Sequence, residues 1–233
     1  MRTIFILVEP AVPGNIGASA RAIKTMGFTE LRLVNTSNHL ADEAKWLAHA
    51  SGDILDNATT YTSLEEATKD IDFLIASSAK KRNIKHEYYP ITEADKIIKD
   101  KKEVVNSVGL VFGREESGLT NQEIELCDIV SYIPIHTTYP SLNLSQAVML
   151  YAYVFSSITK NTTDIAEKKS GEYKGFRSLK RDIAIVLEKI GIKTQSPIYN
   201  RILERISILN TNDLHLIHSI SNKIVKQLFT KER

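Results

Sequence analysis

Apolar runs rich in β-branched residues alternate with amphipathic stretches along the first two-thirds of the chain, and this alternation constrains the fold more than any other feature. It is typical of an α/β fold, in which helices connect parallel strands and cover the sheet. We expect strands at 3–8, 31–34, 73–77, 107–112 and 129–133. We expect helices at 17–26, 41–49, 63–69, 92–99, 121–125 and 143–157.

Three helix starts carry capping signals. Ser63 with Glu66 has the spacing of a capping box. Thr92 and Thr120, each with acidic residues nearby, are expected N-caps.

The last third of the chain has a different pattern. Residues 159–175 are polar, which predicts an exposed linker after an α/β domain at 1–158. Within 176–233, apolar residues recur at helical spacing over 178–190 and 197–229, the latter interrupted by a turn at 210–212. The sequence therefore predicts a small helical extension at the C-terminal side of the α/β domain.

Composition sets limits on location and partners. The chain of 233 residues can bury a substantial core, and its single cysteine, Cys127, cannot form an internal disulfide, which favours a reducing cytoplasm. The apolar run at 4–8 is too short for a signal peptide or a membrane span, so we expect neither a targeting segment nor a membrane partner. A formal charge of +2 does not by itself indicate a nucleic-acid binder. Basic residues gather at 80–85, 96–102 and 168–181, which would form a basic surface if the fold brought them together, although each cluster also fits a solvated helix face.

The segment 9–21 follows the first expected strand and opens a helix with small residues. Gly17 and its small neighbours allow another backbone or an RNA strand to approach closely, and Arg21 can hold a phosphate through two parallel hydrogen bonds. Asn15 is either a functional group or an ordinary N-cap. The segment lacks the glycine spacing of a dinucleotide-binding site or a P-loop, which argues against a nucleotide-binding dehydrogenase or a kinase.

The segment 111–120 runs from a buried strand into a charged loop closed by Gly118. Gly113 permits a torsion or a backbone approach that a side chain would prevent, and amides exposed in this way can hold a nucleoside. Arg114 and Glu115 are expected either to pair with each other or to contact RNA and ligand, whereas Glu116 also fits a surface ion pair.

The segment 133–148 combines a strand end at Ile133 with a turn rich in hydroxyl and amide side chains. Ser141 and Asn143 fit a well-capped helix entry. The same run with Leu142 also suits a ligand that is part adenine and part amino acid.

Together these segments resemble motifs one, two and three of the SpoU/TrmH branch of the SPOUT methyltransferases. The matching positions are Asn15, Gly17 and Arg21, then 110–119, then 133–147, in the family's order over the first 158 residues. The stretch 21–27, the Gly-Leu-Thr-Asn-Gln-Glu run and the helical extension are most similar to the TrmJ group. Pro140 and the spacer 136–138 depart from that group's pattern.

The resemblance implies a trefoil-knotted α/β sheet with flanking helices, a homodimer, and an active site completed by Arg21 of the other subunit. It implies methylation of a ribose 2'-hydroxyl in RNA, and for the TrmJ group a tRNA substrate modified at cytidine or uridine 32. The implied cofactor is S-adenosylmethionine, with S-adenosylhomocysteine as product. Independently of the resemblance, no metal is expected, because the six histidines show no spacing with Cys127 or with carboxylates that is typical of a metal site. The matching cofactor-binding positions are Ser77, Ser78, Ala79, Gly113, Ile133, Ser141, Leu142 and Asn143.

The resemblance also supplies candidate catalytic residues, namely Arg21, Asn15, Glu115, Ser141 and Asn143. Because a guanidinium is always charged in proteins, we expect Arg21 to hold the phosphate beside the target ribose and to stabilise developing negative charge rather than to act as a base. Two other readings stay open: a ribosomal RNA methyltransferase with the same catalytic residues, and a non-catalytic RNA-binding member of the fold.

Overall fold

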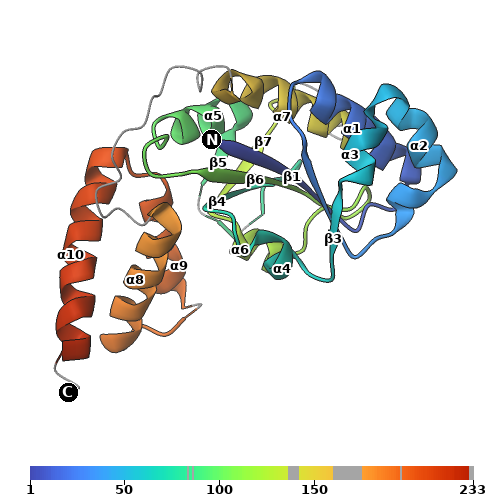
Figure 1. The fold of residues 1–233 in the computed structure, drawn as a ribbon. Coiled ribbons are helices and arrows are strands. Elements are labelled where there is room, and N and C mark those ends of the chain that lie inside the picture. Colours follow the sequence, from blue (N-terminus) through green and yellow to red (C-terminus); the bar gives the residue numbers. More distant parts are fainter. Residues whose placement is uncertain (83, 86, 136–141, 160–174, 195, 231–233) are drawn as a thin grey trace.

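The computed structural model describes residues 1–82, 84–85, 87–135, 142–159, 175–194 and 196–230. Within them, seven strands form one parallel sheet in the order β3-β2-β1-β6-β4-β7-β5 (Figure 1). The strands are β1 (Arg2–Val8), β2 (Glu30–Val34), β3 (Thr59–Tyr61), β4 (Phe73–Ser77), β5 (Tyr88–Pro90), β6 (Ser107–Phe112) and β7 (Ile129–Tyr132).

Helices cover both faces of the sheet, as a parallel sheet requires. One face is covered by α1 (Pro13–Thr25), α3 (Gly52–Asp56), α5 (Ile91–Lys99) and α7 (Leu144–Thr159), with α2 (Asp42–Ala48) packed outside α1 (Figure 1). The other face is covered by α4 (Leu64–Thr68) and α6 (Asn121–Leu126). Two short 3₁₀ turns, η1 (Asn38–Leu40) and η2 (His49–Ser51), flank α2.

Side chains of the central strands alternate between two cores. In β1, Phe5 and Leu7 enter the core under α1 and α7, whereas Ile4 and Ile6 enter the core under α4 and α6. This period of two explains why the central strands are apolar at nearly every position.

The expected α/β architecture is confirmed, and all five expected strands form within one residue of their predicted ends. The prediction missed β3 and β5, which lie at the two edges of the sheet. Each has three residues, too few to show an alternating pattern, and β5 ends in Pro90, which is tolerated at an edge. The short helix α3 was also missed.

Helix starts gave mixed results. Ser63 and Thr120 are N-caps as predicted, and Thr120 forms a full capping box with Glu123. At Ser63 the box is incomplete: the Ser63 hydroxyl accepts from the backbone N–H of Glu66, but the Glu66 carboxylate accepts from Thr62 rather than from the backbone of Ser63. Thr92 is not an N-cap, because Pro90 caps α5 and the helix begins at Ile91. Helix α1 begins four residues earlier than predicted, with Pro13 in its first turn, where proline is favoured because its missing N–H has no partner to lose.

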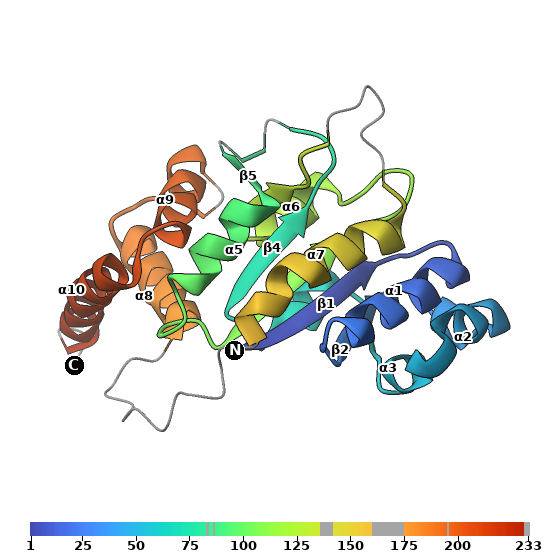
Figure 2. The same cartoon turned by 90° about the horizontal axis from the view of Figure 1, so that it is seen from above.

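The C-terminal helices α8 (Gly175–Lys189), α9 (Pro197–Ser207) and α10 (Thr211–Thr230) form a unit beside α5 (Figure 2). The predicted linker at 159–175 falls almost wholly outside the described residues, so the predicted domain limits stay a prediction. Two lysines of the basic clusters, which the sequence predicts to be at the surface, lie at the junction between the C-terminal helices and the α/β sheet. Lys180 pairs with Asp128 at 2.7 Å, and Lys101 is 1% exposed. In the part of the chain that the structure describes, no helix has the length and apolar character needed to cross a membrane.

Candidate active site

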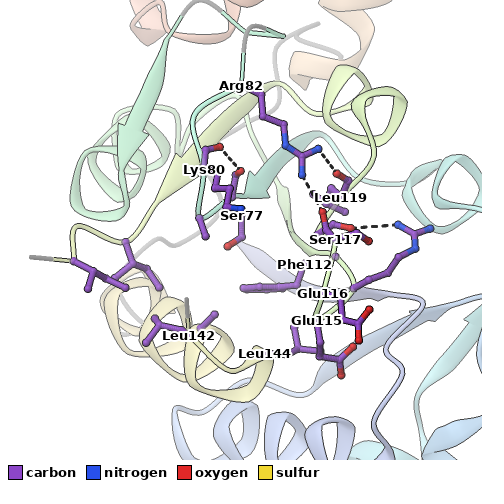
Figure 3. Close-up of a pocket in the computed structure, with 18 residues that line it drawn as sticks. Ser77, Lys80, Arg82, Phe112, Glu115, Glu116, Ser117, Leu119, Leu142 and Leu144 are labelled. Atoms are coloured by element: carbon purple, nitrogen blue, oxygen red, sulfur yellow. Dashed lines mark hydrogen bonds between the residues drawn. The ribbon is translucent and has the colours of Figure 1, made fainter. Parts of the chain in front are cut away.

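A cavity of about 600 Å³ lies where the chain leaves β4, β6 and β7 (Figure 3). Because β6 and β7 are linked through β4 in the sheet, the loops that follow these parallel strands meet at one edge. Six of the predicted cofactor-binding residues line this cavity: Ser77, Ser78, Ala79, Gly113, Ile133 and Leu142. The structure therefore brings three separated segments together around one space of the size of a small-molecule site.

The other predicted site residues lie outside the lining or outside the described chain. Ser141 lies outside the described residues. Asn15 and Asn143 are not among the lining residues, but they join the site through Glu115, which does line the cavity. Arg21 is exposed on α1, and its side chain makes no hydrogen bond or ion pair with another described residue.

Glu115 organises the contact between the first two motif segments. Its carboxylate accepts hydrogen bonds from the side-chain amide of Asn15 at 2.8 Å and from the backbone amides of Ala11 at 2.9 Å and Val12 at 3.3 Å. Burial opposes the charged form, but these hydrogen bonds outweigh it and lower the pKa of Glu115. Asn15 lies inside α1, whose N-cap is Val12, so the reading of Asn15 as an N-cap is wrong.

Asn143 extends this network to the third segment. Its side-chain N–H group donates to Oδ1 of Asn15 at 2.8 Å, while its own Oδ1 accepts from the backbone and the hydroxyl of Ser145. The bond to the backbone satisfies an amide in the first turn of α7, as the capped helix entry predicted. Asn15 thus links Glu115 and Asn143, which lie 100 and 128 residues away in sequence.

Gly113 is required by the loop itself. A Cβ on Gly113 would lie 2.2 Å from the backbone carbon of Gly118 and 2.2 Å from the backbone nitrogen of Leu119. Of the two predicted reasons for glycine, close backbone approach therefore applies, and the approaching backbone belongs to the same loop. Gly17 acts similarly, since a Cβ there would lie 2.0 Å from the carbonyl oxygen of Ala44 in α2.

Arg114 and Glu115 do not pair with each other. Arg114 forms ion pairs with Glu9 at 2.8 Å and with Glu123 at 3.1 Å, and these hydrogen bonds raise the pKa of Arg114. Glu9 has a left-handed backbone with φ of 47°, a conformation that costs energy in a residue other than glycine. Hydrogen bonds from Arg114 and Asn35 hold its carboxylate and lower its pKa. Arg114 therefore has a structural role in joining the ends of β1 and β6.

The sequence did not single out two residues that support the cavity. Arg82, assigned only to a basic cluster, donates to the carbonyl oxygens of Leu119 at 2.6 Å and Ser117 at 2.9 Å (Figure 3). Tyr151 is fully buried behind the cavity, with its hydroxyl bonded to Ser131 and its ring edge against Phe112. No motif signalled either contact, because both join residues from different elements.

Among the described residues, no group of three or more His, Cys, Asp or Glu side chains is placed to hold a metal ion. The expectation of metal-free catalysis stays a prediction.

A parallel α/β sheet with a cavity at the carboxyl ends of its strands is the architecture of enzymes that bind nucleotide-like cofactors. Comparison with known families gives the particular class: residues 2–153 match the model of the SpoU rRNA Methylase family, and residues 174–228 match that of the tRNA/rRNA methyltransferase LasT C-terminal domain. The chain therefore belongs to the SpoU methylase family.

Similar proteins span one or both parts of the chain. A protein of Escherichia coli named uncharacterized tRNA/rRNA methyltransferase LasT is 35% identical, covering 98% of this chain and 99% of that protein. The tRNA (cytidine-2'-O-)-methyltransferase TrmJ of Methanocaldococcus jannaschii is 44% identical and covers 64% of each chain. The structure of a probable methylase family protein from Haemophilus influenzae has a TM-score of 0.64 and 27% identity, covering 98% of both chains.

Proposed function

We propose that this protein transfers a methyl group from S-adenosylmethionine to a ribose 2'-hydroxyl of tRNA. The observation that carries the proposal is the convergence of the three motif segments: Asn15 joins Glu115 and Asn143 at the edge of the cavity that Gly113 and Leu142 line. Relatives named as tRNA 2'-O-methyltransferases support the reaction and the substrate class.

The cavity suits S-adenosylmethionine in size and chemistry. Ile133, Leu142 and Ala147 offer apolar surface for an adenine ring, and the hydroxyl-bearing Ser77 and Ser78 lie at the carboxyl end of the neighbouring strand β4. We assign the cofactor to this space, with the loops after β4, β6 and β7 around it. The trefoil knot implied by the family resemblance is part of the same proposal.

The residues at the edge of the cavity position the nucleophile. When bound, S-adenosylmethionine supplies a methyl group already activated by a sulfonium, so alignment of the ribose is a large part of the catalysis. In our proposal Arg21 binds the phosphate beside the target ribose and stabilises negative charge as the hydroxyl loses its proton. Glu115 holds Asn15 in place, and Asn15 with Asn143 orients the groups around the ribose.

We propose a homodimer in which Arg21 of one subunit completes the site of the other. Two observations support it: Arg21 is exposed without a described partner, and α7, which packs against α1, exposes the large apolar side chains Leu150 and Tyr153. Exposed apolar side chains on a helix beside a candidate site are typical of an interface.

The proposal extends to the nucleotide of the tRNA that is methylated. Nucleotide 32 of the anticodon loop, with cytidine or uridine, follows from the similarity to the TrmJ group. Ribosomal RNA is the second candidate substrate, because residues 2–153 match the model of the SpoU rRNA Methylase family. A cytoplasmic location stays a prediction that rests on the lone Cys127.

A methyl-transfer assay tests the function. Purified protein with labelled S-adenosylmethionine should methylate tRNA, and a tRNA with 2'-deoxycytidine at position 32 should not accept the label. Arg21→Lys should lower kcat/KM about 100-fold, because lysine keeps the charge but loses the planar pair of donors. Arg2→Lys is the matched control, because Arg2 is an exposed arginine at the start of β1, away from the carboxyl ends of the strands where the cavity lies. Labelling of ribosomal RNA but not tRNA would contradict the substrate, and an unchanged rate for Arg21→Lys would contradict the role of Arg21.

A further inference from the structure

A set of polar contacts, linked by the peptide bond between Glu87 and Tyr88, joins the C-terminal helical unit to the wall of the cavity. It runs from Arg205 on α9 through Glu87 and Tyr88 to Arg82, and we name these four residues the α9–Arg82 connection. None of the four is a motif residue, and only Arg82 lines the cavity.

The first part of the connection fixes α9 to the residue before β5. Glu87 receives a hydrogen bond from Arg205 at 2.8 Å and lies 3.6 Å from Arg201. The backbone N–H of Glu87 donates to Glu204, whose side chain is 6% exposed. The hydrogen bond from Tyr89, together with the two arginines, lowers the pKa of Glu87 below its ordinary value despite partial burial. The carboxylate is therefore charged and held from two sides.

The second part fixes β5 to the backbone of Arg82. The hydroxyl of Tyr88 accepts from the backbone N–H of Arg82 at 3.0 Å and donates to its carbonyl oxygen at 2.9 Å. A single side chain thus satisfies both backbone groups of one residue in the segment that follows β4.

The third part reaches the cavity. The guanidinium of Arg82 donates to the carbonyl oxygens of Ser117 and Leu119, on either side of Gly118, and Figure 3 shows these bonds spanning the gap between the two loops. Gly118 is the residue whose backbone lies against Gly113. Arg82 therefore holds the loop after β6 in the closed shape that lines the cavity.

We propose that the C-terminal helical unit, through the α9–Arg82 connection, positions the wall of the cofactor pocket and so sets the affinity for the cofactor. The inference rests on the proposed function, because it takes the cavity to be the site of S-adenosylmethionine. Arg82, Tyr88 and Arg205 are positioning residues in this proposal. Loss of any contact would let the loop after β6 move and would weaken cofactor binding, most strongly for the residue nearest the cavity.

Calorimetric binding of S-adenosylhomocysteine to the full chain tests the proposal. Arg82→Met should raise Kd about tenfold or more, since it removes hydrogen bonds from a charged donor, and Tyr88→Phe and Arg205→Met should each raise it about threefold. Arg2→Met, which removes the exposed ion pairs of Arg2 with Glu30 and Asp70 far from the cavity, should leave Kd unchanged. Arg82→Met, Tyr88→Phe and Arg205→Met should each also show a higher KM for S-adenosylmethionine with kcat close to the wild-type value, which a general loss of folded protein would not produce.

The outcomes separate this inference from the function on which it rests. Wild-type protein that does not bind S-adenosylhomocysteine would overturn both. Wild-type binding together with unchanged Kd and KM in Tyr88→Phe and Arg205→Met, neither of which lines the cavity, would overturn the connection alone. Thermal unfolding of every variant, measured alongside, shows that the protein compared is folded.

Discussion

The loop after β6 and the junction of the C-terminal helices are held in place by different means. The loop is closed by direct backbone contact, with Gly113 against Gly118 and Leu119, to which Arg82 adds hydrogen bonds to the carbonyl oxygens of Ser117 and Leu119. The junction is joined by long charged side chains, chiefly Lys180 to Asp128 and Lys101 to the carbonyl oxygen of Leu209. Backbone contact tolerates no added atom, whereas a charged side chain can be replaced if its partner is not left buried alone. The two regions should therefore respond differently to substitution.

The largest expected effect is at the loop. In Gly113→Ala the new methyl group would lie 2.2 Å from backbone atoms that no rotamer change can move. We expect a loss of stability on the order of 4 kcal/mol and no measurable binding of S-adenosylhomocysteine. Chemical denaturation and calorimetry measure the two quantities.

The matched control for this change is Gly52→Ala. Gly52 begins α3, and a Cβ there would meet nothing within 4 Å. We expect this variant to be as stable as the wild type or slightly more stable, because alanine favours a helix. Equal behaviour of the two variants would contradict the close packing at Gly113.

A smaller effect is expected at the junction. Lys180→Met leaves the carboxylate of Asp128, which is 6% exposed, without its cation, and we expect a loss of about 3 kcal/mol. Asp128 also accepts from the backbone N–H of Leu74 in β4, so the change should affect the sheet as well as α8. Hydrogen exchange should show faster exchange in α8 and α9 than in α1.

The exposed pair between Lys24 and Asp53, also 2.7 Å long, provides the control. Lys24→Met should cost less than about 1 kcal/mol, because water screens an exposed pair. Removing both charges with Lys180→Met and Asp128→Asn should recover part of the lost stability. A double variant no more stable than Lys180→Met would show that the unpaired charge is not the cause.

The same contrast explains how far the sequence predicted the molecule. The central strands were predictable because both of their faces are buried, which makes them apolar at nearly every position. The meeting of Asn15, Glu115 and Asn143 could be expected from the family resemblance, and physically it follows from the carboxyl ends of neighbouring parallel strands meeting at one edge.

The junction could not be predicted, because its contacts join distant residues and leave no local pattern. Lys101 and Leu209 are 108 residues apart, and Lys101 looked like one of several surface lysines at 96–102. The role of Arg82 could not be predicted for the same reason. In the sequence it is one residue of a basic cluster, whereas in the structure it donates hydrogen bonds to two backbone carbonyl groups. A sequence shows that a residue is charged but not what it will face.

The smallest expected effect is a pH dependence at Lys101. Burial lowers the pKa of Lys101 from 10.5 to about 8 in the folded protein, with Asp100 and Asp128 opposing the shift. Between these values the unfolded chain binds a proton that the folded chain has lost, so the free energy of unfolding rises with pH across this window. Below about pH 8 the lysine is charged in both states and its burial costs the full penalty. Relative to Lys101→Met, the wild type should therefore gain about 2 kcal/mol between pH 8 and 10.5.

Denaturant unfolding at a series of pH values measures this difference, and subtracting the Lys101→Met curve removes the titration of all other groups. Lys45→Met is the control, because Lys45 is exposed on α2 and its curve should run parallel to that of the wild type. A Lys101→Met curve that also runs parallel to the wild type would mean that the lysine is solvated and that the helices are not packed over it. If the free energy of unfolding of the wild type rises with pH relative to that of Lys101→Met, the junction keeps a charged group buried at neutral pH. This burial lowers the stability of the folded protein, whereas the backbone contacts of the loop after β6 bury no charge.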